Sequence, residues 1–563
     1  MISLKRPWLV AALLVLGIGI ISAYATILPP KIGIDDADIN FVYARNLALG
    51  HGFVYTPGHE RVEGATSALW TVLLVPGFWL GIPQGWALLL CVALTLVAVW
   101  AAMNLGCQAG GPVGRALVLV GVASLGDFFV WSCLTLMDSA LYSAAIGLAV
   151  MLAAKVDSTS MGRRGTFRMA AASSLLSLSR PEGGLVAPLL AILSGVAVFV
   201  SLGNVRMALR RVAVMLVPSL VSSGILVAIR MLYFGYPLPN TYYAKVSPDR
   251  LYAMWGGAKY VAHFMSGNPV QGTIALGAVF LLLLQLHALL FRPRTAVGPD
   301  ASAVFMAGGT LAIGLVMPLF SGGDHFVGAR LLQPFLPISF VSWVPVAVRT
   351  IEMRSRLPSQ VAVLLVIVGV GWTSLVRRSS DYYTEFAASA GGRAIGRLLT
   401  DCLPKGGRVG VTFAGGIAFA YPYRVVDLLG LNWVKMAHAP GTRHGLYGHA
   451  AFSESVFWTD PPDVVSPQIP GRVPRSVCDT GYYRNENKLL RGLYDARRFR
   501  EEYVPVVLTA RGGLLSAFIR RRFLESLHMS EMHRLQWPSN ATISSCPSEL
   551  QRELAPRESS GDR

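Results

Sequence analysis

The sequence is poor in charged residues. Asp, Glu, Lys and Arg make up only 14% of the 563 residues, while 53% are hydrophobic and the mean hydropathy is +0.50. Soluble domains carry about 25% charged residues, so this composition excludes an ordinary soluble globular protein. Long apolar segments separated by short polar loops instead predict a polytopic membrane protein.

Acidic residues are scarcer than basic ones, with 31 Asp and Glu against 49 Lys and Arg and a formal net charge of +18. A basic protein can bind nucleic acid. Here, however, the basic residues cluster in short loops between apolar segments, which is typical of cytoplasmic loops. We therefore expect no nucleic-acid partner. The loops predicted to be cytoplasmic are 155–168, 206–211, 291–295 and 349–356.

Cysteine is also rare, with six residues, and no CxxC or Cys/His spacing indicates a zinc site. Three cysteines fall in apolar segments and are expected to be small core residues: Cys91, Cys107 and Cys133. The other three lie in the polar C-terminal region: Cys402, Cys478 and Cys546. An oxidising compartment would allow one disulfide among them and leave one thiol over.

The N-terminus is basic and is followed by a long apolar run, which predicts a signal anchor. Further apolar segments follow it. Placing Lys5 and Arg6 in the cytoplasm puts Asp35 on the extracytoplasmic face. Between residues 66 and 154, the apolar segments give one membrane crossing more than the predicted orientation of the loops allows. We therefore expect 112–126 to be re-entrant or short, which gives about ten spans in total. The segments lie at about 66–81, 84–106, 112–135, 138–154, 169–179, 184–204, 212–232, 271–290, 302–320, 329–348 and 360–376.

Composition divides the chain into a transmembrane catalytic domain at 1–376, an extracytoplasmic α/β domain at 377–546 and a polar, disordered tail at 547–563. The second domain is predicted to contain short strands around Gly415 and Gly416, another strand at 425–431, and then a helix-rich portion followed by a strand. The predicted fold class is mostly α, with about ten transmembrane helices and a small α/β domain.

The segment 31–70 is the most acidic of the extracytoplasmic loops, and its charge density places it outside the hydrocarbon core. Its apolar residues recur at helical spacing, which predicts a helix at the membrane surface that ends at Gly50 and Gly52. Asp35, Asp36 and Asp38 lie at its start. One carboxylate could simply cap the helix. Three within four positions favour a general base whose neighbours position a hydroxyl nucleophile.

Three further loops on the same predicted face carry unusual polar residues. In 178–184, Pro and Gly explain a hairpin turn, but Arg180 beside Glu182 also indicates binding of an anionic group. The aromatic residues of 233–246 suit a membrane-interface belt; with Asn240, Tyr242 and Lys245 they also suit a sugar ring. In 321–334, three residues could serve a proton, a hydroxyl or a phosphate: Asp324, His325 and Arg330.

Five motifs, in order and spacing, resemble those of the AftB-type arabinofuranosyltransferases, which belong to the GT-C class of membrane glycosyltransferases. They are DDADINFVYARNLALGHGFVYTPGHERVEGATSALW, SRPEGG, YFGYPLPNTYYAK, GGDHFVGARLLQPFLP and VVDLLGLNW. The resemblance implies transfer of D-arabinofuranose from a polyprenyl-phosphate (decaprenyl-type) donor to an envelope glycan hydroxyl, at the outer face of the plasma membrane. It covers the membrane half and the start of the C-terminal region.

The resemblance also implies residue roles. Asp35 is the expected catalytic base with Asp36 beside it, and Arg180, Lys245 and Arg330 are expected to bind the donor phosphate. Asp138 stands where the family shows a glutamate, and GHAAFSES replaces a later GHE-type element, so the acceptor can differ. The residues expected to bind substrate are Asp38, Arg45, Glu63, Asp138, Glu182, Asn240, Tyr242, Asp324 and His325.

No cofactor or metal is expected, because the basic residues can neutralise phosphate, although three carboxylates with oxygen-rich loops keep a divalent cation as an alternative. Two other functions stay open. A related GT-C enzyme could use the same donor type to glycosylate a secreted or pilin protein. A polyprenyl-lipid flippase or transporter would predict inverted repeats with paired broken helices, and the sequence contains no such repeat. The expected partners are the lipid-linked donor, the glycan or protein acceptor and the bilayer.

Overall fold

The structure, a computed structural model, describes residues 32–156, 162–291, 299–352, 382–403, 407–446, 448–510, 512–527, 532–538 and 542–546. The predicted signal anchor, the segment 360–376 and the tail 547–563 lie outside them. The chain forms two compact units. The helical unit comprises Met1–Gly33, Ala65–Pro237 and Asp249–Phe386, and the sheet unit comprises Ile34–Gly64, Leu238–Pro248 and Ala387–Arg563.

The two units interleave along the chain, which differs from the linear division predicted at residue 376. Two short segments from the first half of the sequence fold with the C-terminal residues rather than with the membrane helices. One of them is the acidic segment, and the other carries Lys245. The sheet unit therefore contains the predicted catalytic carboxylates, whereas the sequence placed them in the transmembrane domain.

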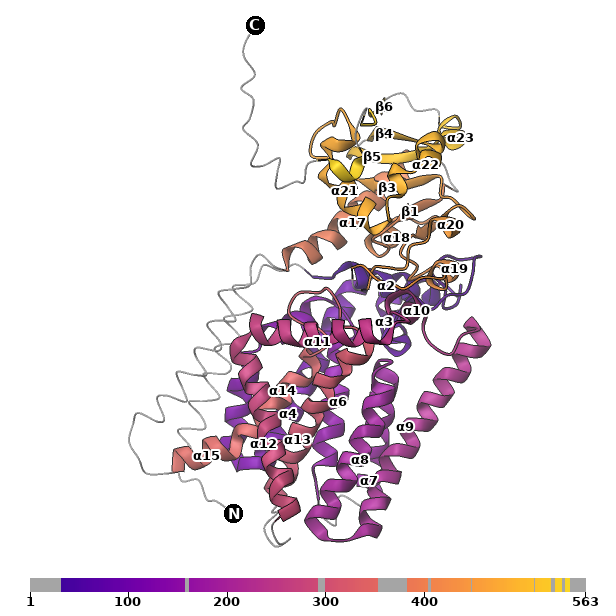
Figure 1. Ribbon diagram of the computed structural model, residues 1–563. Coiled ribbons are helices and arrows are strands. Elements are labelled where there is room, and N and C mark those ends of the chain that lie inside the picture. Colours follow the sequence, from indigo (N-terminus) through magenta and orange to yellow (C-terminus); the bar gives the residue numbers. More distant parts are fainter. Residues whose placement is uncertain are drawn as a thin grey trace. The chain divides into compact units, whose positions relative to one another are not determined.

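The helical unit is built from apolar helices around a core of small and aliphatic side chains. Helices α7, α8 and α9 run side by side, and α11 lies against α12 and α13 (Figure 1). Its elements are α3 (Ala68–Trp79), α4 (Pro83–Ala123), α5 (Gly126–Phe129), η1 (Val130–Leu134), α6 (Ser139–Ala153), α7 (Arg163–Ser179), α8 (Gly183–Leu202), α9 (Val205–Phe234), α11 (Arg250–Gly267), α12 (Pro269–Phe291), α13 (Pro299–Ser321), η4 (Gln333–Phe335), α14 (Leu336–Ser339), η5 (Phe340–Trp343) and α15 (Val344–Glu352).

Within the described residues, five helices are long and apolar enough to cross a membrane, or six if a pair bent by 116° forms one span. These five are Pro83–Ala123, Gly183–Leu202, Val205–Phe234, Pro269–Ala288 and Ala301–Ser321, and the bent pair is Gly126–Leu134 with Ser139–Ala153. The chain is a multi-pass membrane protein, as predicted. The predicted number of about ten spans is not confirmed, and two of the predicted spans lie outside the described residues.

Helix α4 reverses direction at Gly110 and Gly111, where the backbone leaves helical geometry. Gly111 has a φ of 63° and a ψ of −154°, a conformation that glycine adopts readily. The two halves then pack closely, because a Cβ on Gly106 would lie 2.7 Å from the carbonyl oxygen of Gly114. The segments predicted at 84–106 and 112–135 thus correspond to a hairpin whose second half is short.

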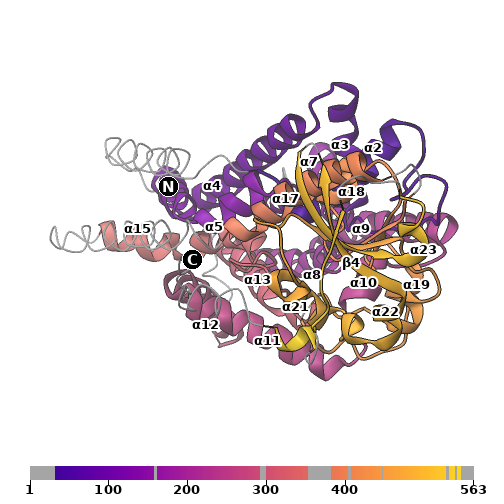
Figure 2. The same cartoon turned by 90° about the horizontal axis from the view of Figure 1, so that it is seen from above.

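The sheet unit contains a six-stranded sheet in the order β2-β1-β3-β5-β4-β6. β2, β1 and β3 pair in parallel, and the remaining pairs are antiparallel. Helix α22 (Arg497–Glu502) lies beside β4 (Figure 2). The strands are β1 (Val409–Val411), β2 (Val425–Asp427), β3 (Val464–Gln468), β4 (Tyr503–Ala510), β5 (Gly513–Arg520) and β6 (Met532–Arg534). The other helices of the unit are α2 (Asp35–Ala48), α10 (Asn240–Lys245), α17 (Tyr383–Cys402), α18 (Gly416–Ala420), α19 (Val434–Ala437), α20 (Glu454–Phe457), η6 (Val477–Asp479), α21 (Gly481–Leu489), η7 (Leu493–Asp495), α23 (Arg521–Leu524) and η8 (Ile543–Ser545).

Two local predictions in this unit are wrong. The segment after Gly415 and Gly416 is the short helix α18 rather than a strand, because the N–H groups of both glycines donate to the carboxylate of Asp35. Helix α2 ends near Gly50 as predicted, but most of its side chains, polar ones included, are buried. Its apolar stripe is therefore buried within the protein and is not exposed to lipid.

One disulfide joins Cys478 to Cys546, while Cys402 is buried and reduced. This is the outcome that an oxidising compartment would allow for the three C-terminal cysteines. The bond ties η8 to η6 in the sheet unit.

Candidate active site

Helix α2 holds helix α18 at both ends. The carboxylate of Asp35 accepts hydrogen bonds from Gly415 N (2.9 Å) and Gly416 N (2.7 Å), at the N-terminus of α18. The guanidinium of Arg45 donates to Phe419 O (2.8 Å) and Ala418 O (3.3 Å) at its C-terminal end. An anion at the N-terminus and a cation at the C-terminus both complement the helix dipole. Arg45 thus stabilises the position of α18, and its predicted role in substrate binding stays a prediction.

The surroundings of Asp35 raise the pKa of its carboxyl group. Burial raises the pKa of its carboxyl to about 7, against the opposing hydrogen bonds from Gly416 and Gly415, and the charges of Asp38 and Asp36 add to the rise. Each carboxylate oxygen can accept more than one hydrogen bond, so the two backbone donors still leave acceptor capacity. A fixed, half-buried carboxylate with a pKa near neutrality matches what a general base requires.

Asp36 points to a different partner. Its Oδ2 lies 3.7 Å from Lys245 Nζ at the end of α10, and both side chains are partly exposed. Helix α10 is fixed by Asn240, whose backbone N–H donates to Glu63 O (3.0 Å) and whose Nδ2 donates to Gly430 O and Leu431 O. The structure thus brings the predicted residues Asp36 and Lys245 together. Asn240 anchors them, and buried Glu63 contributes its backbone carbonyl.

Asp38 and Tyr242, two other residues of this set, differ in exposure. Asp38 is fully buried, and its carboxylate accepts hydrogen bonds from Ser389 Oγ (2.7 Å) and Arg393 Nε (2.9 Å) and pairs with the Arg393 guanidinium. Burial raises the pKa of Asp38, and Arg393 opposes that rise. Tyr242 is half-buried and its ring meets that of Tyr243 edge to face. Asp38 therefore stabilises the attachment of α2 to α17, whereas Tyr242 keeps accessible surface.

In the helical unit, the predicted residues form a buried charge cluster. Arg180 Nε lies 3.4 Å from Asp138 Oδ2 and 3.6 Å from Glu182 Oε2, and the guanidinium stands over the Tyr142 ring at 5.6 Å. Arg180 and Asp138 are both buried. The predicted partnership of Arg180 with Glu182 is present, and Asp138 joins it from the start of α6.

The loop after α13 contributes a second pair to the helical unit. Arg330 Nε bonds to Asp324 Oδ2 at 2.5 Å, and its guanidinium stacks over Phe326 at 4.0 Å and faces Trp131 at 5.8 Å. His325 is exposed, with its ring 4.3 Å from that of Phe326. Asp324 is therefore paired with Arg330, and the roles in substrate binding predicted for Asp324 and His325 stay predictions.

The residues that hold the carboxylates were not predicted from the sequence: Ser389, Arg393 and the N–H donors of Gly415 and Gly416. No local signal marks them, because their partners lie more than 340 positions away. Among the described residues, no group of three or more His, Cys, Asp or Glu side chains could hold a metal ion.

A sequence comparison finds a terminal β-(1→2)-arabinofuranosyltransferase from Mycobacterium tuberculosis that is 28% identical over 352 residues. The match covers 55% of this chain and 52% of the relative, so the chain spans about half the length of the curated relative it matches. It confirms the similarity to arabinofuranosyltransferases that the motifs predicted. Residues 380–524 also match the model of a domain of unknown function, DUF8728.

Comparison with solved structures shows the fold. The oligosaccharyltransferase of Archaeoglobus fulgidus, tethered to an acceptor peptide, superposes with a TM-score of 0.53 at 12% identity, over 98% of this chain and 78% of that one. ArnT from Cupriavidus metallidurans in the apo state gives a TM-score of 0.51 at 12% identity, over 92% and 98% of the two chains. The predicted GT-C-type fold with a small C-terminal sheet domain is confirmed.

Proposed function

We propose that this protein is a membrane glycosyltransferase that moves D-arabinofuranose from a polyprenyl-phosphate donor, of the decaprenyl type, to a hydroxyl of a cell-envelope glycan. The arabinofuranosyltransferase similarity and the GT-C-type fold support this class of reaction. The observation that carries the proposal is the arrangement at the start of α2. There a fixed carboxylate with a pKa of about 7 precedes a carboxylate paired with an ammonium group.

The chemistry follows from the charges that each group carries. Asp35 accepts the proton of the acceptor hydroxyl. At the same time, the oxygen of that hydroxyl forms a bond to the anomeric carbon of the donor sugar. The bond between that carbon and the phosphate oxygen breaks, and the electron pair leaves on the phosphate. Lys245, oriented by Asp36, stabilises the charge on the leaving group, and an anion near the oxocarbenium-like carbon stabilises the opposite charge. Arg180 and Arg330 stay predicted phosphate ligands.

The disulfide supports an extracytoplasmic position for the sheet unit. Disulfides persist in oxidising compartments and are rare in the cytosol, and Cys478 and Cys546 are bonded. We therefore propose that the reaction takes place at the outer face of the plasma membrane, where a lipid-linked donor keeps its polyprenyl chain in the bilayer.

The direct test is transfer by the purified full-length chain in lipid nanodiscs. We expect label from polyprenyl-phosphate [14C]arabinofuranose to appear on arabinofuranose oligosaccharides. Label on a peptide acceptor instead would indicate the protein-glycosylating alternative. Movement of the intact donor between leaflets, unaffected by Asp35→Asn and Asp36→Asn, would indicate a flippase. Absence of all label from both acceptors would contradict the proposal.

The pH dependence provides a second test. A general base acts when deprotonated, so kcat/KM is expected to rise with pH through about 7, with a slope of one proton, and then to level off. The contribution of Asp35 to the free energy of unfolding changes with pH in the opposite direction to kcat/KM. Its folded pKa is raised, so this contribution is fully present below the unfolded pKa and is lost as the pH rises through about 7. Initial rates and thermal unfolding between pH 5 and 9 measure the two trends, and parallel trends would contradict this assignment.

Lys245→Met is expected to raise the KM for the lipid-linked donor about tenfold or more, because it removes a charge-assisted contact worth roughly 1.5–3 kcal/mol. The KM for the glycan acceptor should change much less. Steady-state kinetics with each substrate varied in turn give both values. Lys488→Met, at an exposed lysine of the same unit, is the matched control. Equal increases in the two KM values would refute a role confined to the donor.

A further inference from the structure

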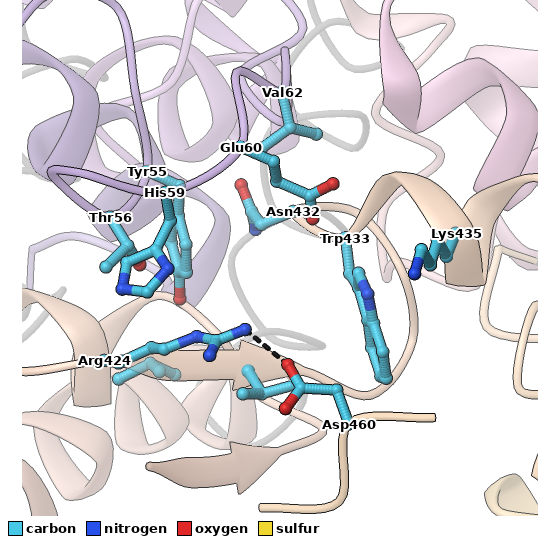
Figure 3. A pocket seen from close by; sticks show the side chains of 12 residues that line it. Tyr55, Thr56, His59, Glu60, Val62, Arg424, Asn432, Trp433, Lys435 and Asp460 are labelled. Carbon is cyan, nitrogen blue, oxygen red and sulfur yellow. Dashed lines mark hydrogen bonds and ion pairs between the residues drawn. The ribbon is translucent and has the colours of Figure 1, made fainter. Parts of the chain in front are cut away.

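The sheet unit contains a cavity of about 220 Å³ that the proposed reaction does not use (Figure 3). Trp433 stands on one side, and Tyr55 and His59 stand on the other (Figure 3). This volume is below the roughly 300–1,000 Å³ of sites for drug-sized ligands, so the cavity suits one small ring. Its lining comprises Tyr55, Thr56, His59, Glu60, Val62, Arg424, Val425, Val426, Asn432, Trp433, Lys435 and Asp460.

The charges around this cavity cancel. Arg424 and Lys435 are cationic, and Glu60 and Asp460 are anionic. Burial and the nearby Arg424 lower the pKa of His59. Because of this lowering, the imidazole is neutral at pH 7. Arg424 Nη2 also bonds to Asp460 Oδ2 at 2.5 Å. A phosphate would meet carboxylates as well as cations, so the lining favours an uncharged ligand.

The cavity combines flat aromatic faces with hydrogen-bonding groups. Trp433 and Tyr55 supply ring surface, and Glu60, Asn432 and Asp460 supply carboxylate and amide groups (Figure 3). The Glu60 side chain is exposed, and its Oε1 accepts a hydrogen bond from Val434 N (3.3 Å). A few convergent polar groups around an apolar surface fix the orientation of a small ligand. A sugar ring has both an apolar C–H face and hydroxyl groups.

Short connections link this cavity to the proposed catalytic groups of the same unit. Tyr55 Oη donates to Ala414 O at 2.5 Å, and the next residue, Gly415, binds Asp35. On the other side, Leu431 O accepts from Asn240 at the start of α10, the helix that carries Lys245. The walls of the cavity are therefore continuous with the supports of both the carboxylate and the ammonium group.

We infer that this cavity binds one neutral sugar residue of the acceptor glycan, away from the hydroxyl that reacts. The inference rests on the proposed function and deepens it by assigning an acceptor subsite. Trp433 stacks on the sugar ring, and Glu60 accepts hydrogen bonds from its hydroxyl groups. Binding here holds the acceptor chain beside the sheet unit while a neighbouring residue enters the reaction.

The experiment is a calorimetric titration of the full-length protein, in nanodiscs without donor, with a linear hexasaccharide of arabinofuranose. We expect the wild-type protein to bind it, Glu60→Gln to raise the Kd about tenfold, and Trp433→Ala to abolish binding. Glu501→Gln and Trp537→Ala, outside the cavity lining, are matched controls expected to keep the wild-type Kd. If Trp433→Ala fails to fold, Glu60→Gln alone decides.

Three results would overturn the inference. They are a wild-type protein that does not bind the hexasaccharide, a Glu60→Gln variant with the wild-type Kd, and displacement of the hexasaccharide by inorganic phosphate. The titration needs no donor and no turnover, so it is independent of the transfer assay. Transfer with an unchanged Kd in Glu60→Gln would refute only the subsite. Binding without any transfer from the arabinose donor would refute only the proposed reaction.

Discussion

Asp35→Asn is expected to lower kcat by about 10²–10⁴-fold, the usual contribution of a positioned general base. The amide cannot accept the hydroxyl proton at neutral pH, although it keeps the size of the carboxyl group. The KM for the donor should change little, because Lys245 is paired with Asp36 rather than with Asp35. Single-turnover transfer in nanodiscs measures the rate, and a loss below about threefold would remove Asp35 from the role of base.

Asp35 also holds helix α18, so its variant needs a control that separates chemistry from structure. Gly415→Ala provides it, because the added Cβ would overlap the carbonyl oxygen of Asp35 while the carboxyl group remains. We expect Gly415→Ala to lower the thermal unfolding temperature and to keep a one-proton rise in the pH profile, with a shifted midpoint because the Gly415 N–H bond that lowers the pKa of Asp35 is disturbed. Asp35→Asn should abolish that rise. Loss of the rise in Gly415→Ala would show that the attachment, and not the base, sets the profile.

The acidic segment and its helix could be predicted from the sequence as part of the candidate site, because local charge and periodicity are properties of neighbouring residues. It placed Asp35, Asp36 and Lys245 among the important residues, and the structure brings Asp36 and Lys245 within 3.7 Å. The break at Gly110 and Gly111 was equally visible, since a glycine pair before Pro112 interrupts an apolar run.

The partners of these residues could not be predicted in the same way. Asp35 and Arg45 meet the two ends of α18, and Asp38 meets α17, across sequence separations of more than 340 residues. No periodicity reports such a pairing. The error over α18 has the same cause, because the carboxylate that fixes its first N–H groups comes from the other end of the chain. The burial of α2 also depends on those contacts.

Arg393→Met is expected to destabilise the sheet unit by about 3–5 kcal/mol, the usual cost of leaving one member of a buried ion pair uncompensated. Asp38 is fully buried, and Arg393 supplies two of the groups that bind its carboxylate. Hydrogen exchange of the α2 and α17 amides in the full-length protein, together with thermal unfolding, measures the change. Arg397→Met, at an exposed arginine one turn later in α17, is the matched control and should shift neither measurement.

The pH dependence of this loss identifies its cause. Burial already raises the pKa of Asp38, and removal of Arg393 removes the largest influence that lowers it, leaving the hydrogen bond from Ser389. The folded variant therefore binds a proton that the unfolded chain releases, so its stability is greatest at low pH and falls as the pH rises. The double variant Asp38→Asn with Arg393→Met removes both charges and should recover part of the lost stability. A deficit that is independent of pH and unchanged in the double variant would point to lost packing of Arg393 against Phe419, where the guanidinium lies 5.0 Å from the ring centre.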